Sequence, residues 1–417
     1  MQLKRVVVTG LGALTPIGNS APDFWNGLIN GVSGSAPIVR FNAEKFKTRF
    51  ACEVKGFNIE NYLDKKEGRK LDAYSQYAIA VSDEAVKDAG LDFSKFDVDR
   101  IGVIWGAGIG GLDTFLHECS AFAKGDGTPR FNPFFIPKMI ADIAAGHISI
   151  RHGLRGPNFT TVAACASSTN ALIDAFNYIR LGKAKMIVAG GSEAACNEAG
   201  VGGFNAMHAL STRNDDPQTA SRPFDKDRDG FVLGEGAACI ILEELEHALA
   251  RGAKIYAEFA GGGLSADANH ITAPHPEGLG AKNVMNFALE DAEMKPEGID
   301  YINVHGTSTP LGDIAESKAI KAVFGEHAYK LNISSTKSMT GHLLGAAGAI
   351  EAAACIMSIQ HQMVPPTINH FTDDPEIDNN LNFTFNKAQK REVRAALSNT
   401  FGFGGHNASL IFKKYIA

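Results

Sequence analysis

Residues 158–174, "NFTTVAACASSTNALID", describe a strand that runs through a turn of very small side chains into a helix. Cys165, the cysteine of this stretch, lies among alanines and serines. The apolar spacing that follows, up to Gly182, predicts an amphipathic helix, so the sulfur lies at or just before a helix N-terminus. The N–H groups and the dipole of such an end favour a thiolate. Small neighbours leave room for a ligand to approach the sulfur, although a tightly packed structural cysteine would have them as well.

Short apolar runs that end in turn residues recur along the chain and are typical of strands buried on both faces. They are residues 6–9, 101–105, 186–189, 238–242, 301–304 and 410–412. Helical patterns lie between several of these runs, and residues 71–90 place Tyr74, Tyr77 and Val81 on one apolar stripe that ends at Gly90. Alternating strands and helices predict a layered α/β architecture.

A weak internal repeat relates two parts of the chain. Residues 99–115 resemble residues 300–316, and residues 159–179 resemble residues 333–356. The repeat places Cys165 and His342 at comparable helix entrances. Because no linker separates the two parts, we expect related halves, residues 1–255 and 256–417, that share one compact body.

Composition narrows the class of protein. The chain has 417 residues, a net charge of −6 and a pI near 6.1, so an overall attraction to nucleic acid or to anionic membranes is not expected. Its six cysteines lie far apart without metal-ligand spacing, which indicates free thiols in a reducing compartment and no metal site. The apolar run within the first 18 residues is too short and too glycine-interrupted for a signal peptide or a membrane anchor. Residues 342–359 are expected to form a helix buried between protein layers. We therefore expect a cytoplasmic protein.

Glycine is abundant, with 44 residues, and it clusters in "GAGIGG", "AGGSEA", "AGGG" and "FGFGG". Glycine lets the backbone approach a ligand or another backbone closely. We therefore expect these clusters to form loops around a site.

Two histidines occur in positions similar to that of the cysteine. His305 follows the apolar run "YINV", and His342 lies in "TKSMTGHLLGAAGA". The carboxyl end of a strand is where α/β folds place their sites. Each residue alone is more often structural, but a cysteine and two histidines at glycine- or alanine-lined turns together form a candidate site.

Four motifs occur in order along the chain: "VAACASS" around Cys165, "NVHGTSTPLGD" around His305, "STKSMTGHLLGAAG" around His342 and "NTFGFGGHN" near the end. Together they resemble the β-ketoacyl-acyl carrier protein synthases of the thiolase superfamily, most of all the type II group, which are elongating condensing enzymes. The resemblance covers essentially the whole chain. It implies a thiolase-like layered α/β fold with mixed sheets in two related halves and buried helices between them.

The resemblance also implies a reaction, the decarboxylative Claisen condensation that elongates fatty acids by two carbons. Cys165 would hold the acyl chain as a thioester. His305 and His342 would stabilise the enolate that malonyl-acyl carrier protein forms when it loses CO₂, and the backbone N–H groups of Cys165 and Phe403 would form an oxyanion hole. The product would be 3-oxoacyl-acyl carrier protein. No cofactor is expected, because the pantetheine arm arrives on the carrier protein.

Other positions take supporting roles by the same resemblance. Lys337 and Glu351 would support the second histidine in a buried polar network. Phe403 stands between glycines, which suggests a hinged gate to the acyl pocket, although a hydrophobic staple in a tight turn is an alternative. The remaining assignments are Thr272, Thr307 and Thr309 to the pantetheine channel, and Ile109 and Phe204 with Phe403 to the acyl pocket and gate.

An acidic enzyme that binds an acidic carrier protein needs a local basic patch. "LDKKEGRKLD" concentrates Lys65, Lys66, Arg69 and Lys70, to which Arg130 and Arg213 add. The resemblance implies a docking role, whereas the residues alone also fit a solvated helix start. "TPRFNPFF" offers only Arg130, where related enzymes often carry two basic residues. A homodimer is expected from the resemblance alone.

Competing functions leave different signatures. A thiolase would use a second cysteine as acid and base, an initiating synthase would have asparagine in place of one histidine, and a polyketide chain-length factor would lack the nucleophile. A papain-like hydrolase remains open. It would release free acid from an acyl thioester, whereas a condensing enzyme would stay acylated until the malonyl carrier arrives.

Overall fold

A computed structural model describes residues 3–416, and its sheet consists of two five-stranded parts. The first part contains, in spatial order, β5 (Asn158–Thr161), β4 (Ile101–Gly106), β6 (Met186–Glu193), β7 (Gly236–Glu244) and β1 (Val6–Leu14). The second contains β10 (Asn332–Ser334), β9 (Tyr301–Asn303), β13 (Ala395–Gly402), β14 (His406–Lys413) and β8 (Ala257–Ala266). In each part the first three strands are parallel and the last two pairings are antiparallel. The matching topology confirms two related halves, which a short antiparallel pairing of β1 with β8 joins. The boundary between residues 255 and 256 stays a prediction.

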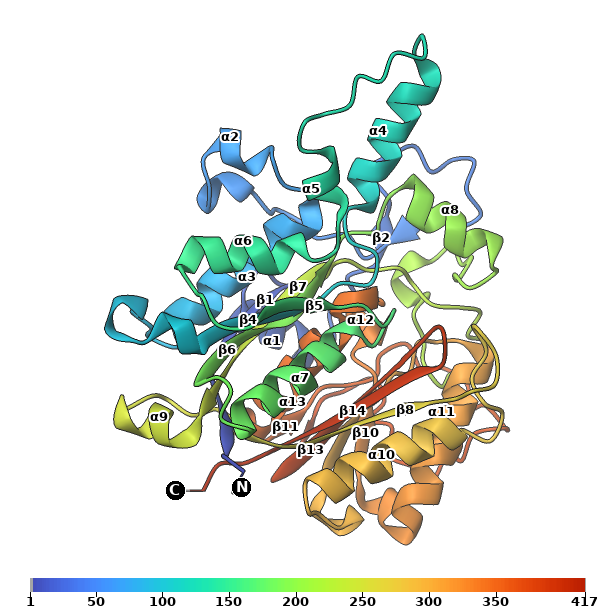
Figure 1. Cartoon of the computed structure of the whole chain (residues 1–417). Helices are drawn as coiled ribbons and strands as arrows, with labels where there is room; N and C mark the ends of the chain where they lie inside the picture. The colour runs from blue at the N-terminus through green and yellow to red at the C-terminus, as the bar shows by residue number, and fades with distance from the viewer. Residues whose placement is uncertain (1–2, 417) are drawn as a thin grey trace.

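Helices cover both parts of the sheet and fill the space between them (Figure 1). α7 (Ser167–Arg180) and α13 (Ala347–His361) form the middle layer and pack on both parts. α3 (Ala73–Asp88) and α6 (Ile143–His152) cover the outer face of the first part. α10 (Leu279–Asp291) and α11 (Pro310–Phe324) cover the outer face of the second. The predicted layered α/β architecture is confirmed.

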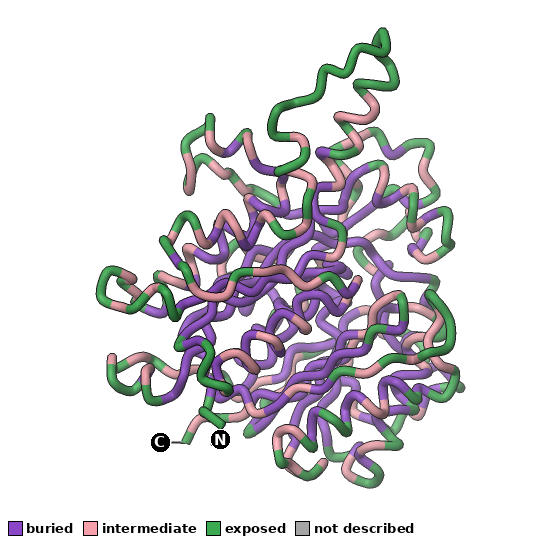
Figure 2. Tube along the Cα trace, viewed as in Figure 1, coloured by how far each residue is buried: buried purple, intermediate pink, exposed green. Residues whose placement is uncertain are grey.

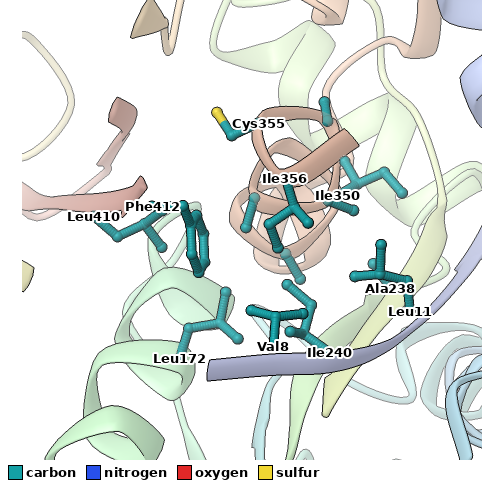
Figure 3. Close-up of a cluster of buried hydrophobic side chains, with 14 of the residues drawn as sticks. Val8, Leu11, Leu172, Ala238, Ile240, Ile350, Cys355, Ile356, Leu410 and Phe412 are labelled. Carbon is teal, nitrogen blue, oxygen red and sulfur yellow. The ribbon is translucent and has the colours of Figure 1, made fainter. Parts of the chain in front are cut away.

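The middle layer is the centre of the hydrophobic core. Ile350 and Ile356 of α13 face Leu172 of α7, with Val8 of β1 and Phe412 of β14 beside them (Figure 3). Every residue of α13 from Ala347 to Ile359 is buried, as the purple centre of Figure 2 shows. A helix without a solvent face explains the alanine- and glycine-rich sequence, because two sheets approach it closely.

The buried helix begins later than the sequence suggests. Residues 342–346 form an irregular turn, of which Leu344–Ala346 is a single 3₁₀ turn, before α13 starts at Ala347. Leu344 has a φ of +48°, which is incompatible with a continuous α-helix. His342 therefore lies in a loop ahead of the helix and not on it.

The expectation that the glycine clusters form loops is wrong for two of them. Gly190 and Gly191 lie inside β6, and Gly261–Gly263 lie inside β8. A Cβ atom at Gly190 would lie 2.0 Å from the carbonyl oxygen of Ala238, and one at Gly262 would lie 2.7 Å from the side chain of Ile173. These glycines allow close packing of strands against their neighbours.

The six predicted apolar runs lie in β1, β4, β6, β7, β9 and β14, and residues 71–90 contain α3. Four other strands belong to the same sheet. β5 and β10 were indicated by the stretch around Cys165 and by the internal repeat, whereas β8, which is rich in glycine, and β13, which carries polar residues, were not predicted. The remaining helices are α1 (Ala21–Ile29), α2 (Lys65–Gly68), α4 (Leu112–Lys124), α5 (Phe135–Met139), α8 (Glu198–Ala206), α9 (Leu245–Ala250) and α12 (Lys337–Thr340). The short strands β2 (Ala36–Pro37) and β3 (Phe50–Ala51) pair with each other, as do β11 (Met363–Val364) and β12 (Gln389–Lys390).

α4 and α5 project from the layered body as a largely exposed hairpin (Figures 1 and 2). Across residues 3–416, none of the helices combines the length and the apolar character needed to cross a membrane.

Candidate active site

Cys165 lies in a strained turn between β5 and α7. Ala164 has a φ of +47°, which is uncommon for a residue with a side chain. Ser167, the first residue of α7, braces the turn: its Oγ accepts the N–H of Ala163 at 2.9 Å and donates to the carbonyl of Ala164 at 2.7 Å. The expected helix entrance is confirmed, and the brace holds the cysteine just ahead of α7.

The protonation of this sulfur differs from the expectation. Burial raises the pKa of the Cys165 thiol to about 12. The positive charge of Lys337 and the backbone N–H groups of Phe403 and Cys165 act in the opposite direction. The cost of removing a thiolate from water outweighs the stabilisation that the helix N-terminus gives it, so Cys165 is a thiol at neutral pH.

Both predicted histidines lie beside the cysteine. Nε2 of His342 is 3.0 Å from Sγ of Cys165. The ring of His305 lies perpendicular to that of His342, with ring centroids 5.3 Å apart. Burial and the positive charge of Lys337 lower the pKa of both histidines well below the ordinary value, so both rings are neutral at pH 7. The structure thus brings together three residues that are far apart in the sequence.

The loop that carries His305 is held by a carboxylate that sequence analysis missed. Glu316 of α11 accepts the backbone N–H groups of His305 at 2.9 Å and Gly306 at 2.8 Å. Asn399 of β13 donates to the same carboxylate at 3.2 Å. A signal was present, since Glu316 lies on the apolar stripe of its helix, where an acidic side chain requires partners.

Lys337 and Glu351 form an ion pair in the interior behind the histidines. Their side chains are 2% and 1% exposed, and Nζ of Lys337 contacts Oε1 of Glu351. Burial raises the pKa of Glu351, and the ammonium group beside it opposes that shift. The pair lies where a network that supports the histidines is expected, and its supporting role stays a prediction.

Glu193 is a second carboxylate that sequence analysis missed. It lies at the end of β6, is completely buried and accepts the N–H groups of Gly108, Ile109 and Gly110 at 2.8 to 3.2 Å. It also accepts the N–H of Gly345 at 3.1 Å, in the loop between His342 and α13. Glu193 therefore fixes a loop of the first half against a loop of the second. Its position after an apolar strand is the sequence feature that could have identified Glu193 as a site residue.

A cavity of about 450 Å³ extends from the reactive sulfur. Its lining includes Cys165, both histidines, Phe204, Phe403, Thr272, Thr307 and Thr309. The hydroxyls of Thr307 and Thr309 lie 3.0 Å apart on one wall. Ile109 does not line this cavity, and its assignment to the acyl pocket stays a prediction.

Phe403 lies in the tight turn between β13 and β14. Gly404 and Gly405 follow it with φ values of +87° and +73°, which favour glycine. A Cβ atom at Gly402 would lie 3.1 Å from the backbone nitrogen of Cys165, so the turn packs directly on the backbone of this cysteine. The ring of Phe403 lies 6.5 Å from that of Phe204. This placement fits both a gate and a staple.

The predicted docking residues differ in whether a nearby carboxylate neutralises their charge. Lys65 lies 3.7 Å from Glu60, Lys70 lies 2.6 Å from Glu67, and Arg130 lies 3.4 Å from Asp126. Lys66 and Arg69 are exposed, and neither has a carboxylate partner within 4.0 Å in residues 3–416. α2, which carries the first of these residues, lies across the upper part of the molecule from α8, which carries Phe204 (Figure 1). Arg213 donates to the carbonyl of Asp227 at 3.2 Å.

The chain matches two family models of one enzyme class. Residues 3–248 match the N-terminal domain of beta-ketoacyl synthases, and residues 256–371 match their C-terminal domain. The chain therefore belongs to the beta-ketoacyl synthase family.

Individual proteins that are similar to this chain are named as synthases or ketosynthases. The chain is 51% identical over 415 residues to a 3-oxoacyl-[acyl-carrier-protein] synthase 2 from Synechocystis sp., covering 100% of this chain and 99% of that protein. It is also 51% identical over 417 residues to the protein of the same name from Staphylococcus aureus, with complete coverage of both. A crystal structure of a beta-ketoacyl synthase from Burkholderia phymatum is 36% identical with a TM-score of 0.92, covering 99% of this chain and 100% of that one. A type II polyketide ketosynthase solved in complex with its acyl-carrier protein is 34% identical with a TM-score of 0.90, again covering 99% and 100%.

Proposed function

We propose that this enzyme condenses an acyl group held on Cys165 with malonyl-acyl carrier protein and so elongates fatty acids by two carbons. The observation that carries this proposal is the meeting of one thiol and two neutral histidines at one cavity. Thr272, Thr307 and Thr309 provide hydroxyls along the same cavity, where a pantetheine arm would bind. The names of the similar synthases support the same reaction.

The first half-reaction transfers the acyl chain. Sγ of Cys165 attacks the carbonyl carbon of the acyl thioester, the new carbon–sulfur bond forms, and the bond to the pantetheine sulfur breaks. The thiol proton leaves with the pantetheine thiol. The N–H groups of Cys165 and Phe403 would hold the oxyanion of the tetrahedral intermediate. The close packing of Gly402 on the backbone nitrogen of Cys165 supports this role, because Phe403 follows Gly402 in the same turn.

The second half-reaction uses the histidines as hydrogen-bond donors. Nδ1 of each ring is buried without a hydrogen-bond partner in residues 3–416, so a proton is best placed on Nε2. When the malonyl group loses CO₂, the electron pair of the broken carbon–carbon bond forms an enolate, and the two Nε2–H groups stabilise its oxygen. The enolate carbon attacks the thioester on Cys165. The sulfur leaves as a thiolate and takes up a proton, and 3-oxoacyl-acyl carrier protein is released.

We propose that the carrier protein docks on the basic residues Lys65, Lys66, Arg69, Lys70 and Arg130. Lys66 and Arg69 are best suited, since they are exposed and unneutralised. Lys70 lies 5.5 Å from the ring of Phe134, which places α2 next to the segment between α4 and α5 that carries Arg130. The pantetheine arm would reach the cavity as part of the substrate, so no separate cofactor is required.

We also propose that the enzyme is a homodimer. β5 is an edge strand of the sheet, and Val162 directly after it is exposed. Exposed aromatic side chains of the α4–α5 hairpin, among them Phe115 and Phe131, add an apolar surface. Open strand edges and apolar patches of this kind are typical of interfaces.

The six cysteines of the chain are free thiols, which supports a cytoplasmic location of the enzyme.

Intact-mass measurement after mixing with acyl carrier proteins of graded chain length tests the proposed function. We expect one acyl group per chain, placed on Cys165 by peptide mapping and stable until malonyl-acyl carrier protein is added. Release of free acid without the malonyl substrate would favour the hydrolase. Acyl label on Cys196 or Cys355 instead would contradict the assignment of the nucleophile.

A further inference from the structure

Arg228 is a buried arginine without a part in the reaction described above. Its side chain is 2% exposed. Nε donates to the carbonyl of Thr309 at 3.2 Å and Nη2 to that of Pro310 at 2.9 Å, while Nη1 donates to the carbonyl of Asp225 at 2.7 Å and the carboxylate of Asp374 at 2.6 Å. A guanidinium holds five N–H donors in fixed directions, which a lysine does not. Arg228 therefore fixes three chain segments relative to one another.

One of these segments is a wall of the cavity. Thr307 and Thr309 line it, and Ser308 between them has a φ of +69°, a left-handed conformation that is uncommon for a residue with a side chain. Such a conformation persists only where its surroundings hold it. The N–H of Gly230 donates to the carbonyl of Ser308 at 3.1 Å, and the Oγ of Ser308 accepts the N–H of Arg222 at 3.0 Å. The wall thus depends on the loop of residues 222–230.

That loop also supplies a part of the cavity lining that adjoins this wall. Asp229, Gly230 and Phe231 line the cavity together with Thr307 and Thr309, whereas Arg228 itself does not line it. Arg228 reaches from the loop to the backbone of the wall. Its hydrogen bonds therefore fix two adjoining parts of the cavity lining relative to each other.

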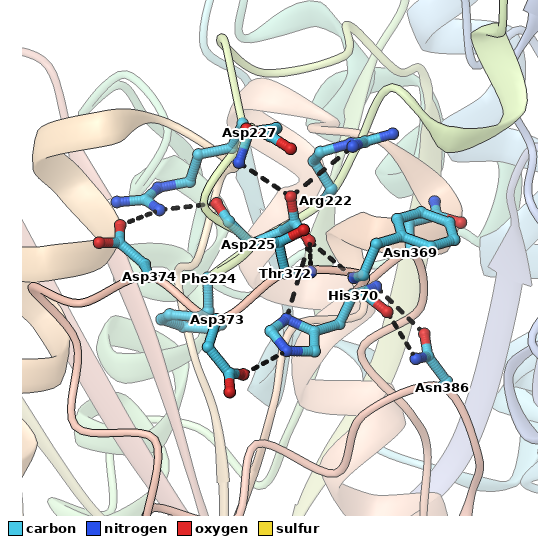
Figure 4. Close-up of polar contacts among 12 residues, drawn as sticks. Arg222, Phe224, Asp225, Asp227, Asn369, His370, Thr372, Asp373, Asp374 and Asn386 are labelled. Carbon is cyan, nitrogen blue, oxygen red and sulfur yellow. Dashed lines mark hydrogen bonds and ion pairs between the residues drawn. The ribbon is translucent and has the colours of Figure 1, made fainter.

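The other end of Arg228 is anchored independently of the cavity. Asp225 is completely buried and accepts the N–H groups of Phe371 at 2.7 Å and Thr372 at 2.8 Å. Figure 4 shows Asp225 and Asp374 in this network. The segment that carries Asp374 is therefore tied to the base of the loop, which gives the guanidinium a fixed support.

We propose that Arg228 is a positioning residue for substrate binding, which holds the Thr307–Pro310 wall in the position relative to Gly230 and Phe231 that a pantetheine arm requires. This inference rests on the proposed function, in which that arm occupies the cavity. Because Arg228 acts through the wall, its loss weakens binding of pantetheine thioesters more than it slows the chemical steps.

The test is Arg228→Lys, which keeps the charge and removes the planar fork. Arg251→Lys is the matched control: its side chain is 14% exposed, its guanidinium donates to the carboxylate of Glu243 and the carbonyl of Ala89, and it does not line the cavity. We expect Arg228→Lys to raise KM for malonyl and acyl thioesters of pantetheine about tenfold, equivalent to about 1.4 kcal/mol, with kcat within about twofold. Arg251→Lys should leave KM within about twofold. Alkylation of Cys165 by iodoacetamide, which is small and carries no pantetheine arm, should be unchanged in each variant.

A double-mutant cycle separates positioning from general damage. Thr307→Val combined with Arg228→Lys should lower kcat/KM by less than the product of the two single effects, because both act on the same wall. Thr307→Val combined with Arg251→Lys should give the product of the two single effects. Should Arg228→Lys fail to fold, Asp374→Asn removes one anchor and leaves the arginine in place, with a smaller rise in KM expected.

An unchanged KM in Arg228→Lys, an equal rise in Arg251→Lys, or multiplicative effects of Arg228→Lys with Thr307→Val would overturn the inference. Failure of the proposed function looks different, since the unaltered enzyme would then not acquire an acyl group on Cys165.

Discussion

The two histidines can be tested separately from the thiol by removing the sulfur. Cys165→Ala eliminates the acyl acceptor, so condensation should stop. The histidines remain, and decarboxylation of malonyl-acyl carrier protein should continue. His305→Ala or His342→Ala is then added to the Cys165→Ala enzyme, where any further loss acts on the enolate alone.

The structure sets the expected size of the loss. The two rings are neutral and perpendicular, with centroids 5.3 Å apart, so both Nε2–H groups can converge on one oxygen. A preorganised donor in a buried site contributes roughly 3 to 4 kcal/mol to a developing oxyanion, which corresponds to about 10²- to 10³-fold in rate. Each histidine substitution should therefore slow decarboxylation at least ~100-fold.

The assay is CO₂ release from labelled malonyl-acyl carrier protein, with acyl transfer in the Cys165-containing enzymes followed by intact mass. Cys119→Ala serves as a cysteine control, because Cys119 lies on α4 outside the cavity. In enzymes that keep Cys165, His305→Ala should leave acyl transfer less affected than decarboxylation. Loss of decarboxylation in Cys165→Ala itself, or equal loss of both half-reactions in His305→Ala, would show that the histidines serve the thiol and would refute the enolate role.

If Phe403 gates the acyl pocket, Phe403→Ala should shift the tolerated chain lengths with a modest loss of stability; unchanged selectivity with a large drop in Tm would favour the staple. Lys66→Glu with Arg69→Glu should raise KM for carrier-bound substrates severalfold, less so at high salt, because the Debye length is only ~8 Å at physiological ionic strength, and turnover of small thioesters should hardly change. Equal loss for both kinds of substrate, or no salt effect, would assign these residues to the fold. The lowered pKa of His305 and His342 keeps both rings neutral as the pH falls, so decarboxylation should show no inflection near the ordinary histidine pKa of about 6.5, and an inflection there would mean that the rings titrate normally.

Much of the fold could be read from local patterns. Apolar runs located six strands, the stripe of residues 71–90 located α3, and the repeat indicated two related halves. β8 and β13 were not predicted, because strand patterns are recognised by their apolar side chains. These two strands have glycine or polar residues where neighbouring elements pack on them.

The candidate site was also predicted only in part. Motifs identified Cys165, His305 and His342, since short stretches of small residues around a reactive side chain are visible in one dimension. Glu316 and Glu193 were missed because their function depends on which backbone N–H groups they accept, and those belong to distant segments.

The sequence by itself determined the reactive residue types, the class of fold and the helix entrance at Cys165, because each follows from neighbours a few positions apart. Tertiary structure alone decided that Nε2 of His342 lies 3.0 Å from the sulfur and that the ring of His305 lies 5.3 Å from that of His342. It also decided the protonation states. A helix N-terminus predicts a thiolate at Cys165, but packing between the two halves removes water from the sulfur and from both rings, and this desolvation raises the thiol pKa to about 12 and lowers those of the histidines.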